Sequence, residues 1–200
     1  MTMRFLLPFI AVASVYSGHV LAEVRPPKPA TSQKKPTVPK VVQPKWKVFT
    51  PPDKSFSVLM PGRPKKKTQV QKTYMGKINL EMFVAQPPQQ EVVYLVTYNS
   101  FPFNYAQMAK PQTILNQARD NTLKATRSNL VNQRNIRSSN GHPGKEIEYV
   151  DSAGKITKAR MYFAEGRLYQ VMAIVSKKQK PTLEKTIVGY LDSFQLVLKK

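Results

Sequence analysis

The sequence predicts an α+β fold in which a mainly antiparallel β-sheet is flanked by helices. The strongest observation is a hairpin over residues 156–175, where two β-rich runs flank the turn Glu165-Gly166. Its second strand is apolar on both faces, which is typical of a strand that is covered on both sides. The order of elements is strands, a helix, strands and a second helix with tight β connections, and this order completes the prediction.

The hairpin also predicts its own register. With Glu165-Gly166 as a two-residue turn, Tyr162 faces Tyr169 and Phe163 faces Leu168, and both are favourable cross-strand pairs. We therefore expect this hairpin in the interior of the sheet.

The N-terminus has the pattern of a secretory signal peptide. Arg4 supplies the positive charge, residues 5–16 are apolar, and the small residues Val20 and Ala22 stand where a signal peptidase reads the chain. We expect residues 1–22 to be removed by cleavage after Ala22; the alternative is an uncleaved membrane anchor. The protein is then exported to a periplasmic, thylakoid-lumenal or extracellular location, which the sequence does not separate.

Residues 23–45 read as a disordered linker rich in proline and lysine. The segment holds six prolines in 23 residues and a single acidic residue, Glu23. Proline at this density favours extended polyproline II and blocks helix and sheet. The linker is either a plain spacer or a cationic arm that touches anionic polymers, and a single α+β domain over residues 46–200 follows it.

The first half of this domain predicts strands. The expected strands cover residues 46–49, 55–60, 68–74, 77–85 and 92–98. The third is polar and alternating, which suits the edge of a sheet. The fifth is apolar on both faces, so we expect a second central strand there.

The second half predicts two helices around further strands. Five residues share one arc of a helix over residues 111–130, namely Ile114, Leu115, Ala118, Thr122 and Ala125. The remaining expected elements are strands at 131–138 and 145–150 around a turn at 140–144, then the hairpin, a helix from residue 181 and a short last strand at 195–198.

The charge predicts an anionic partner. The chain carries a net charge of +21, and residues 46–200 hold 25 Lys and Arg against 10 Asp and Glu, a net charge of +15. Such a balance favours acidic protein surfaces, membrane headgroups or wall polymers, while export removes intracellular nucleic acid from consideration. The alternative is a basic surface that is merely solvated. The residues expected to contact the partner are Lys65, Lys66, Lys67, Arg134 and Arg137.

The chain offers little for catalysis, and we predict no catalytic, metal-binding or cofactor-binding residue. It contains no cysteine, which excludes a disulfide framework, a thiol nucleophile and a lipidated N-terminal cysteine. Only His142 lies beyond the leader. Glu146 and Glu148 share one face of a strand and are expected to meet Arg134, Arg160 or Lys158 across the sheet. The enzymatic alternative is a hydrolase built on His142 and Glu146.

An aromatic loop suggests a different kind of site. Phe101, Phe103 and Tyr105 follow the fifth strand. They either pack the next helix onto the sheet or form the lip of a pocket between sheet and helix. The second possibility predicts a module that binds a small molecule or lipid.

Several blocks resemble an exported bacterial family common in cyanobacteria. They are Trp46…Phe49…Phe56-Ser-Val-Leu-Met-Pro-Gly-Arg-Pro64, Tyr94-Leu-Val-Thr-Tyr98, Ile114-Leu-Asn-Gln-Ala-Arg-Asp120, Gly141-His-Pro-Gly-Lys-Glu146, Arg167-Leu-Tyr-Gln-Val171 and Asp192-Ser-Phe194. In architecture this family is similar to PsbP-like and DcrB-like domains, in which helices sandwich an antiparallel sheet. The resemblance implies an α/β/α sandwich that works as a binding or assembly factor rather than an enzyme. We therefore predict an exported, monomeric, non-enzymatic binding domain, with peripheral membrane contact as one form of the partner.

Overall fold

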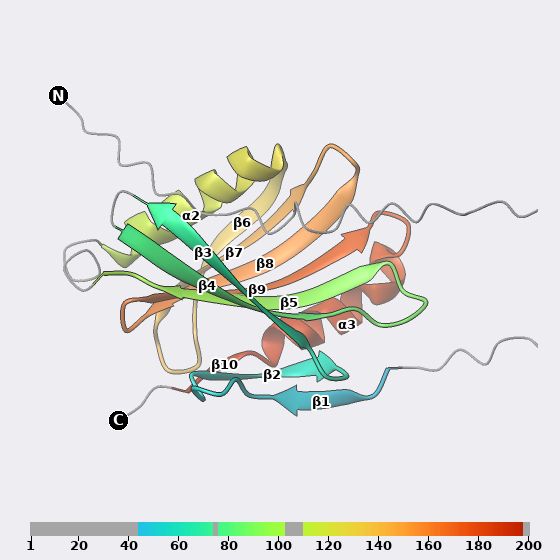
Figure 1. The fold of residues 1–200 in the computed structure, drawn as a ribbon. Helices are drawn as coiled ribbons and strands as arrows, with labels where there is room; N and C mark the ends of the chain where they lie inside the picture. The colour runs from blue at the N-terminus through green and yellow to red at the C-terminus, as the bar shows by residue number, and fades with distance from the viewer. Residues whose placement is uncertain (1–43, 74–75, 103–109, 198–200) are drawn as a thin grey trace, which may run out of the picture.

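The computed structural model describes residues 44–73, 76–102 and 110–197 (Figure 1). The predicted signal peptide and all but the last two residues of the predicted linker lie outside this part of the chain. The described residues form two helices and two β-sheets with antiparallel pairing throughout. None of the described helices is long and apolar enough to cross a membrane. The predicted α+β fold is confirmed.

The larger sheet has seven strands in the order β3-β4-β5-β9-β8-β7-β6. Their bounds are β3 (Lys65–Thr73), β4 (Gly76–Ala85), β5 (Val92–Ser100), β6 (Asn129–Arg137), β7 (Pro143–Val150), β8 (Lys155–Ala164) and β9 (Arg167–Ser176). The two strands that are apolar on both faces, β5 and β9, lie side by side in the middle of the sheet. Tyr162 pairs with Tyr169 and Phe163 with Leu168, so the predicted hairpin register is confirmed.

A second, three-stranded sheet was not expected. It has the order β1-β2-β10, with β1 (Trp46–Phe49), β2 (Phe56–Pro61) and β10 (Gln195–Leu196). Phe56, Val58 and Met60 of β2 are fully or almost fully buried against one face of the large sheet. The alternation of β2 therefore serves packing between two sheets, and the end of the chain completes the small sheet through β10.

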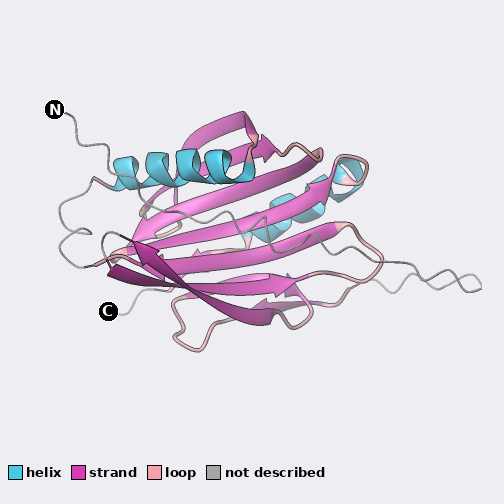
Figure 2. Ribbon diagram, turned by 45° about the horizontal axis from the view of Figure 1, so that its top comes forward, coloured by secondary structure: helices cyan, strands magenta, loops and turns pink. Residues whose placement is uncertain are grey.

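The two helices cover opposite faces of the large sheet (Figure 2). α2 (Pro111–Thr126) packs on β7 and β8 through the predicted arc, which includes Ile114 and Leu115. Ala125, the last residue of that arc, is exposed, because the helix ends one residue later. α3 (Lys180–Asp192) packs on β8 and β9 and buries Ile187, Tyr190 and Leu191. One face of β5 and β9 belongs to the core cluster that contains β2 and α3, and the other face belongs to the cluster that contains α2, which explains why both strands are apolar on both sides.

Several element boundaries differ from the prediction. β3 begins at Lys65 rather than residue 68, so the three lysines belong to the edge strand itself. α2 ends at Thr126 rather than residue 130, because Arg127 takes the left-handed conformation (φ 50°) that closes a helix. β7 begins at Pro143 rather than residue 145, which places Gly144 in a strand instead of a turn.

Candidate functional site

Two adjoining hollows lie where β2 leads into β3 and β4 leads into β5. Their volumes are about 640 Å³ and about 520 Å³. Because Pro61, Arg63 and Pro88 line both, we treat the hollows as one surface and call it the cationic groove. The remaining lining residues are Pro44, Lys45, Lys47, Val48, Phe49, Gly62, Pro64, Lys65, Val84, Ala85, Gln86, Pro87, Gln89, Gln90, Glu91 and Gln179.

A tight turn between β2 and β3 forms one wall of the cationic groove. Gly62 has a φ of +85°, a conformation that side chains rarely adopt. Its N–H donates a hydrogen bond to the carbonyl oxygen of Lys45 at 3.1 Å. This bond holds the start of β1 beside the start of β3, so Lys45 and Arg63 line the same hollow although they are distant in the sequence.

The loop between β4 and β5 forms the opposite wall. Pro87 and Pro88 end β4, and Gln89 takes a left-handed conformation with φ 65°. The N–H of Glu91 donates to Oε1 of Gln179 at 2.8 Å, and the N–H of Ser176 donates to the carbonyl oxygen of Glu91 at 3.2 Å. The loop is therefore fastened to the turn between β9 and α3.

The cationic groove carries uncompensated positive charge. Lys45, Lys47, Arg63 and Lys65 are all exposed, and none of these four side chains forms an ion pair within the part of the chain that the structure describes. Among the lining residues only Glu91 carries a carboxylate. Four cations around a concave, proline-rich surface suit a ligand that brings carboxylates or phosphates.

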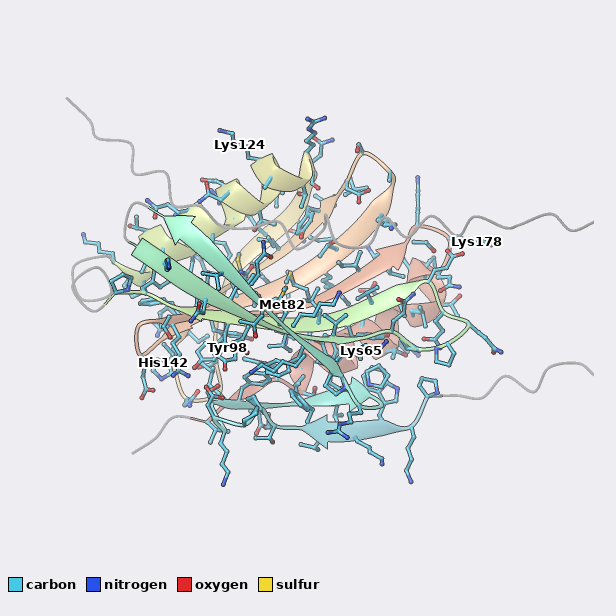
Figure 3. All side chains as sticks on the ribbon, in the orientation of Figure 1. Lys65, Met82, Tyr98, Lys124, His142 and Lys178 are labelled. Atoms are coloured by element: carbon cyan, nitrogen blue, oxygen red, sulfur yellow. The ribbon has the colours of Figure 1, made fainter. Side chains whose placement is uncertain are left out.

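The structure separates the three predicted lysines of β3. Lys65 lines the cationic groove; its position at the start of β3 is labelled in Figure 3. Lys66 forms an ion pair with Glu81 of β4, with 2.7 Å between Nζ and Oε2. Lys67 pairs in register with Met82 and projects to the same side of the strand as Lys65. Of the three, Lys65 is the one that the structure places in the groove.

Arg134 and Arg137 lie at the other edge of the large sheet. β3 and β6 are separated by six inter-strand steps of about 4.8 Å, on the order of 30 Å across a flat sheet. The Nε atom of Arg134 donates to Glu146 at 2.9 Å, and Nη1 of Arg137 donates to the carbonyl oxygen of Gly141 at 2.8 Å. The five predicted contact residues therefore do not form one site.

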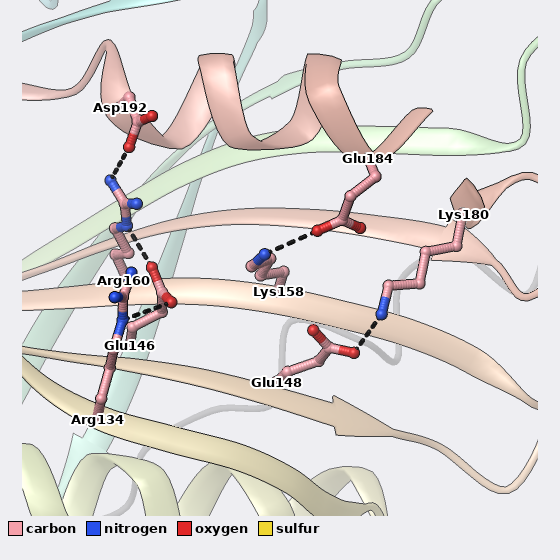
Figure 4. Close-up of polar contacts among 8 residues, drawn as sticks. All are labelled: Arg134, Glu146, Glu148, Lys158, Arg160, Lys180, Glu184 and Asp192. Atoms are coloured by element: carbon pink, nitrogen blue, oxygen red, sulfur yellow. Dashed lines mark hydrogen bonds and ion pairs between the residues drawn. The ribbon is translucent and has the colours of Figure 1, made fainter. Parts of the chain in front are cut away.

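Glu146 sits in an ion-pair network beneath α3 (Figure 4). Its two carboxylate oxygens accept hydrogen bonds from Nε of Arg134 at 2.9 Å and Nε of Arg160 at 2.6 Å, and Arg160 also contacts Asp192 of α3 at 2.7 Å. Burial alone would raise the pKa of Glu146, but the two guanidinium groups outweigh it and hold the pKa below its ordinary value. The predicted pairing with Arg134 and Arg160 is present, and both oxygens are occupied.

The same network continues along α3. Glu148 contacts Lys180, and Nζ of Lys158 donates to Glu184 at 2.9 Å (Figure 4). Glu148 was expected to meet a cation across the sheet, but its partner comes from α3 instead. These pairs fasten the helix to β7 and β8, which is a structural role.

His142 lies in the tight turn between β6 and β7. Its N–H donates to Oγ of Ser138, and its carbonyl oxygen accepts from the N–H of Ser138, both at 2.9 Å. Within the described ranges, no group of three His, Cys, Asp or Glu residues is placed to hold a metal ion. If His142 acted as a base, Glu146 would not be free to assist it, because its carboxylate is already bound to two arginines.

Phe101 is buried against Phe163 of β8, with 5.9 Å between ring centroids. It belongs to the cluster between the sheet and α2. Phe103 and Tyr105, the other predicted lip residues, lie outside the described residues. What the structure shows of the aromatic loop is thus one residue that packs in the core.

The sequence did not single out Arg63, Lys45 or Lys47. The patterns Pro61-Gly62-Arg63-Pro64 and Pro87-Pro88 indicated only where strands end. One signal was present, since a cation stands between two chain-breaking prolines at 61 and 64. Whether this cation contributes to a site depends on which other loops lie beside it in the fold, and the sequence does not show those neighbours.

Comparison with known proteins identifies the fold. No protein-family model and no curated protein matches the chain. Among solved structures, the solution structure of cyanobacterial PsbP (CyanoP) from Synechocystis sp. PCC 6803 matches with a TM-score of 0.55 and 10% identity, over 82% of this chain and 98% of that one. A protein of unknown function from Pseudomonas aeruginosa, PA94, a putative regulator, gives a TM-score of 0.44 and 11% identity over 66% of this chain and 98% of its own. The chain therefore has a PsbP-like fold.

Proposed function

We propose that this PsbP-like chain is an exported, non-enzymatic binding domain that docks an anionic partner in the cationic groove. One observation carries the proposal: Lys45, Lys47, Arg63 and Lys65 surround a concave surface and have no ion-pair partner among the described residues. Elsewhere the described carboxylates are largely engaged, as Figure 4 illustrates for Glu146.

The contact residues expected from the sequence lie at both edges of the large sheet. The residues proposed here as contacts lie instead at one end of the molecule. Lys177 and Lys178 are exposed in the turn to which the β4–β5 loop is fastened, and they extend the positive surface beyond the groove. Charges gathered on one side attract a counter-charged partner and raise the association rate, an effect that salt weakens. We therefore expect binding that depends strongly on ionic strength.

The assignment as a binding domain also rests on the state of the acid–base candidates. Glu146 has a lowered pKa and two guanidinium partners, so it is a poor proton acceptor near neutral pH. His142 is held in a turn by Ser138. Export is supported by the leader-like residues 1–22 of the sequence.

The test compares two double charge reversals. Arg63→Glu with Lys65→Glu alters the cationic groove, and Lys124→Glu with Lys185→Glu makes the same change in net charge at exposed positions on the two helices. Binding of the purified full chain is measured by fluorescence anisotropy and vesicle co-sedimentation. The probes are polyglutamate, vesicles with anionic headgroups and dextran sulfate, each at low and high salt.

We expect at least one probe to bind at low salt, with the groove variant weakened roughly five- to thirtyfold. Two lost charge contacts of ~0.5–1 kcal/mol each give this factor. The helix variant should bind within about twofold of wild type. Equal loss in both variants would mean that net charge alone attracts the probe, and absence of binding to all probes at low salt would overturn the proposed function.

A further inference from the structure

The smaller hollow of the cationic groove is lined by two kinds of side chain. Apart from Gly62, every lining residue is either apolar or cationic. The apolar part consists of four prolines with Val48 and Phe49, and the cations are Lys45, Lys47 and Arg63. None of these side chains can accept a hydrogen bond. The hollow therefore suits a ligand that places an apolar group against the prolines and an anionic group beside the cations.

Val48 leaves apolar surface open in this hollow. Its side chain is 70% exposed, and across the pair of β1 and β2 it stands opposite Leu59, which is 37% exposed. The next residue, Phe49, is held by the core, because its ring packs on that of Phe83 with 4.9 Å between centroids. A ligand group placed against Val48 would remove apolar surface from water on a support that is already formed, and both effects favour binding.

We propose that the anionic partner is a polypeptide, and that it inserts an apolar side chain flanked by acidic residues into the smaller hollow. The inference rests on the proposed function, since it assigns a partner class to the same groove. The acidic residues of the segment lie against Lys45, Lys47 and Arg63. Its apolar side chain covers Val48 and the prolines.

The larger hollow favours a peptide backbone. It is lined by the side-chain amides of Gln86, Gln89 and Gln90. An amide both donates and accepts hydrogen bonds, and the peptide groups of an extended segment do the same. Because Arg63 and Pro88 line both hollows, one segment can contact the apolar hollow and the glutamines in succession.

Other anionic partners would use less of this surface. The hydroxyl groups of a polysaccharide would find no side chain in the smaller hollow that accepts a hydrogen bond. A bilayer surface is broad, whereas the apolar lining of this hollow is confined to the four prolines and two further side chains. One apolar side chain of a polypeptide matches that extent, and therefore we favour a polypeptide.

The single carboxylate that lines the groove sets the charge pattern of the segment. Glu91 lines the larger hollow, while three of the four cations line the smaller one. Like charges repel each other, and opposite charges attract. We therefore expect the acidic residues of the segment at the smaller hollow and neutral polar residues beside Glu91.

The experiment compares two short peptides with blocked ends, Glu-Glu-Leu-Glu-Glu and Glu-Glu-Ser-Glu-Glu, which carry the same charge. Binding of each peptide to the purified full chain is measured by fluorescence anisotropy at low and at moderate salt. We expect the leucine peptide to bind wild type about fivefold more tightly or better, because one leucine side chain is partly buried. Salt should weaken both peptides and preserve their ratio, since screening acts on charge.

Two charge-neutral variants locate the apolar contact. Val48→Asn removes apolar surface from the smaller hollow, and Val131→Asn makes the same change at a 60% exposed valine of β6, at the other edge of the large sheet from β3. Val48→Asn should reduce the preference for the leucine peptide to about twofold or less, whereas Val131→Asn should leave it unchanged. Binding of the serine peptide should be the same in both variants and in wild type, which separates a lost contact from a lost fold.

Each contrary result has its own consequence. Equal affinity of the two peptides for wild type would overturn the apolar contact and leave a purely electrostatic groove. Equal effects of Val48→Asn and Val131→Asn would overturn the smaller hollow as its location. Binding of phosphatidylglycerol vesicles but of neither peptide would overturn the polypeptide partner and keep the proposed function. If neither peptides, vesicles nor dextran sulfate bind at low salt, both proposals fail together.

Discussion

Gly144→Ala provides a severe test of the packing between β7 and β8. A Cβ atom at residue 144 would lie 2.7 Å from the carbonyl oxygen of Met161 and 2.7 Å from Cδ1 of Tyr162. The first atom belongs to the backbone of the neighbouring strand. The ring of Tyr162 cannot easily turn away, because it is stacked on Phe194 with 5.6 Å between centroids and an interplanar angle of 9°. Glycine is therefore required here for close approach.

The expected magnitude follows from two opposing effects. Overpacking a well-packed site costs about 1–3 kcal/mol. Replacing glycine with alanine recovers roughly 0.5–1 kcal/mol, because the unfolded chain loses conformational freedom. We expect a net loss of about 1–2 kcal/mol in the free energy of unfolding. For a domain of this size the melting temperature should fall by about 2–8 °C.

Gly189→Ala is the matched control. Gly189 lies in α3, and a Cβ atom there would meet no other atom within 4 Å. Alanine should stabilise the helix by about 1 kcal/mol, so the same chemical change has the opposite sign. Urea unfolding followed by the fluorescence of Trp46, the single tryptophan, and thermal unfolding followed by circular dichroism measure both variants. If Gly144→Ala is as stable as wild type, the close approach of β7 to β8 described here is wrong.

Three further predictions concern charged and polar groups. Glu146→Gln should cost about 1–2 kcal/mol, because the partly buried guanidinium of Arg160 loses a charged partner. The folded-state pKa of Glu146 lies below its ordinary value of 4.5, so its stabilising contribution is present above that pH and lost as the pH falls through the folded value; urea midpoints between about pH 3 and pH 6 should vary less in the variant. Burial raises the pKa of Tyr94 to about 12, and its buried hydroxyl has no hydrogen-bond partner in the described part of the chain. Tyr94→Phe should therefore leave the free energy of unfolding at pH 7 unchanged or raise it by about 1 kcal/mol. Between pH 10 and pH 12 the variant should lose less stability than wild type, because the residue that titrates there is gone. Asp53→Asn removes an ion pair of 2.8 Å with Arg167 and should cost at most about 1 kcal/mol, with a smaller difference at high salt, since both side chains are about one-third exposed.

Each of these predictions has a contrary outcome. An unchanged acid dependence in Glu146→Gln would mean that the carboxylate is not stabilised by its arginines. A large loss of stability in Tyr94→Phe would show that the hydroxyl has a partner. A salt-independent cost in Asp53→Asn would point to weakened hydrogen bonds from Ser55 to residue 53 rather than to the lost ion pair.

Local patterns were sufficient for most of the fold. The turn at Glu165-Gly166 determines the register of β8 and β9, because a two-residue loop leaves one way to pair the flanking strands. β5 and β9 could be identified as central strands, since only strands covered on both sides are apolar on both faces. The buried arc of α2 followed from helical periodicity.

The small sheet was beyond the reach of these patterns. β2 pairs with β10, which lies at the other end of the described chain, and a two-residue strand carries almost no periodic signal. The end of α2 was also misplaced, because nothing in its composition marks Arg127 as the left-handed residue that closes the helix. Gly144 looked like part of a turn, although its role is to admit the ring of Tyr162.

In the candidate site, too, some features follow from local sequence patterns and others only from contacts between distant residues. The sequence by itself determined a basic α+β domain with a polar strand at the edge of the sheet, because net charge and alternation are properties of composition and of neighbouring residues. Tertiary structure decided that Lys66 is paired with Glu81 while Lys65 joins Arg63 and Lys45 around a groove. Those contacts depend on a turn at Gly62 and on loops from distant parts of the chain, and such non-local contacts leave no periodic trace in the sequence.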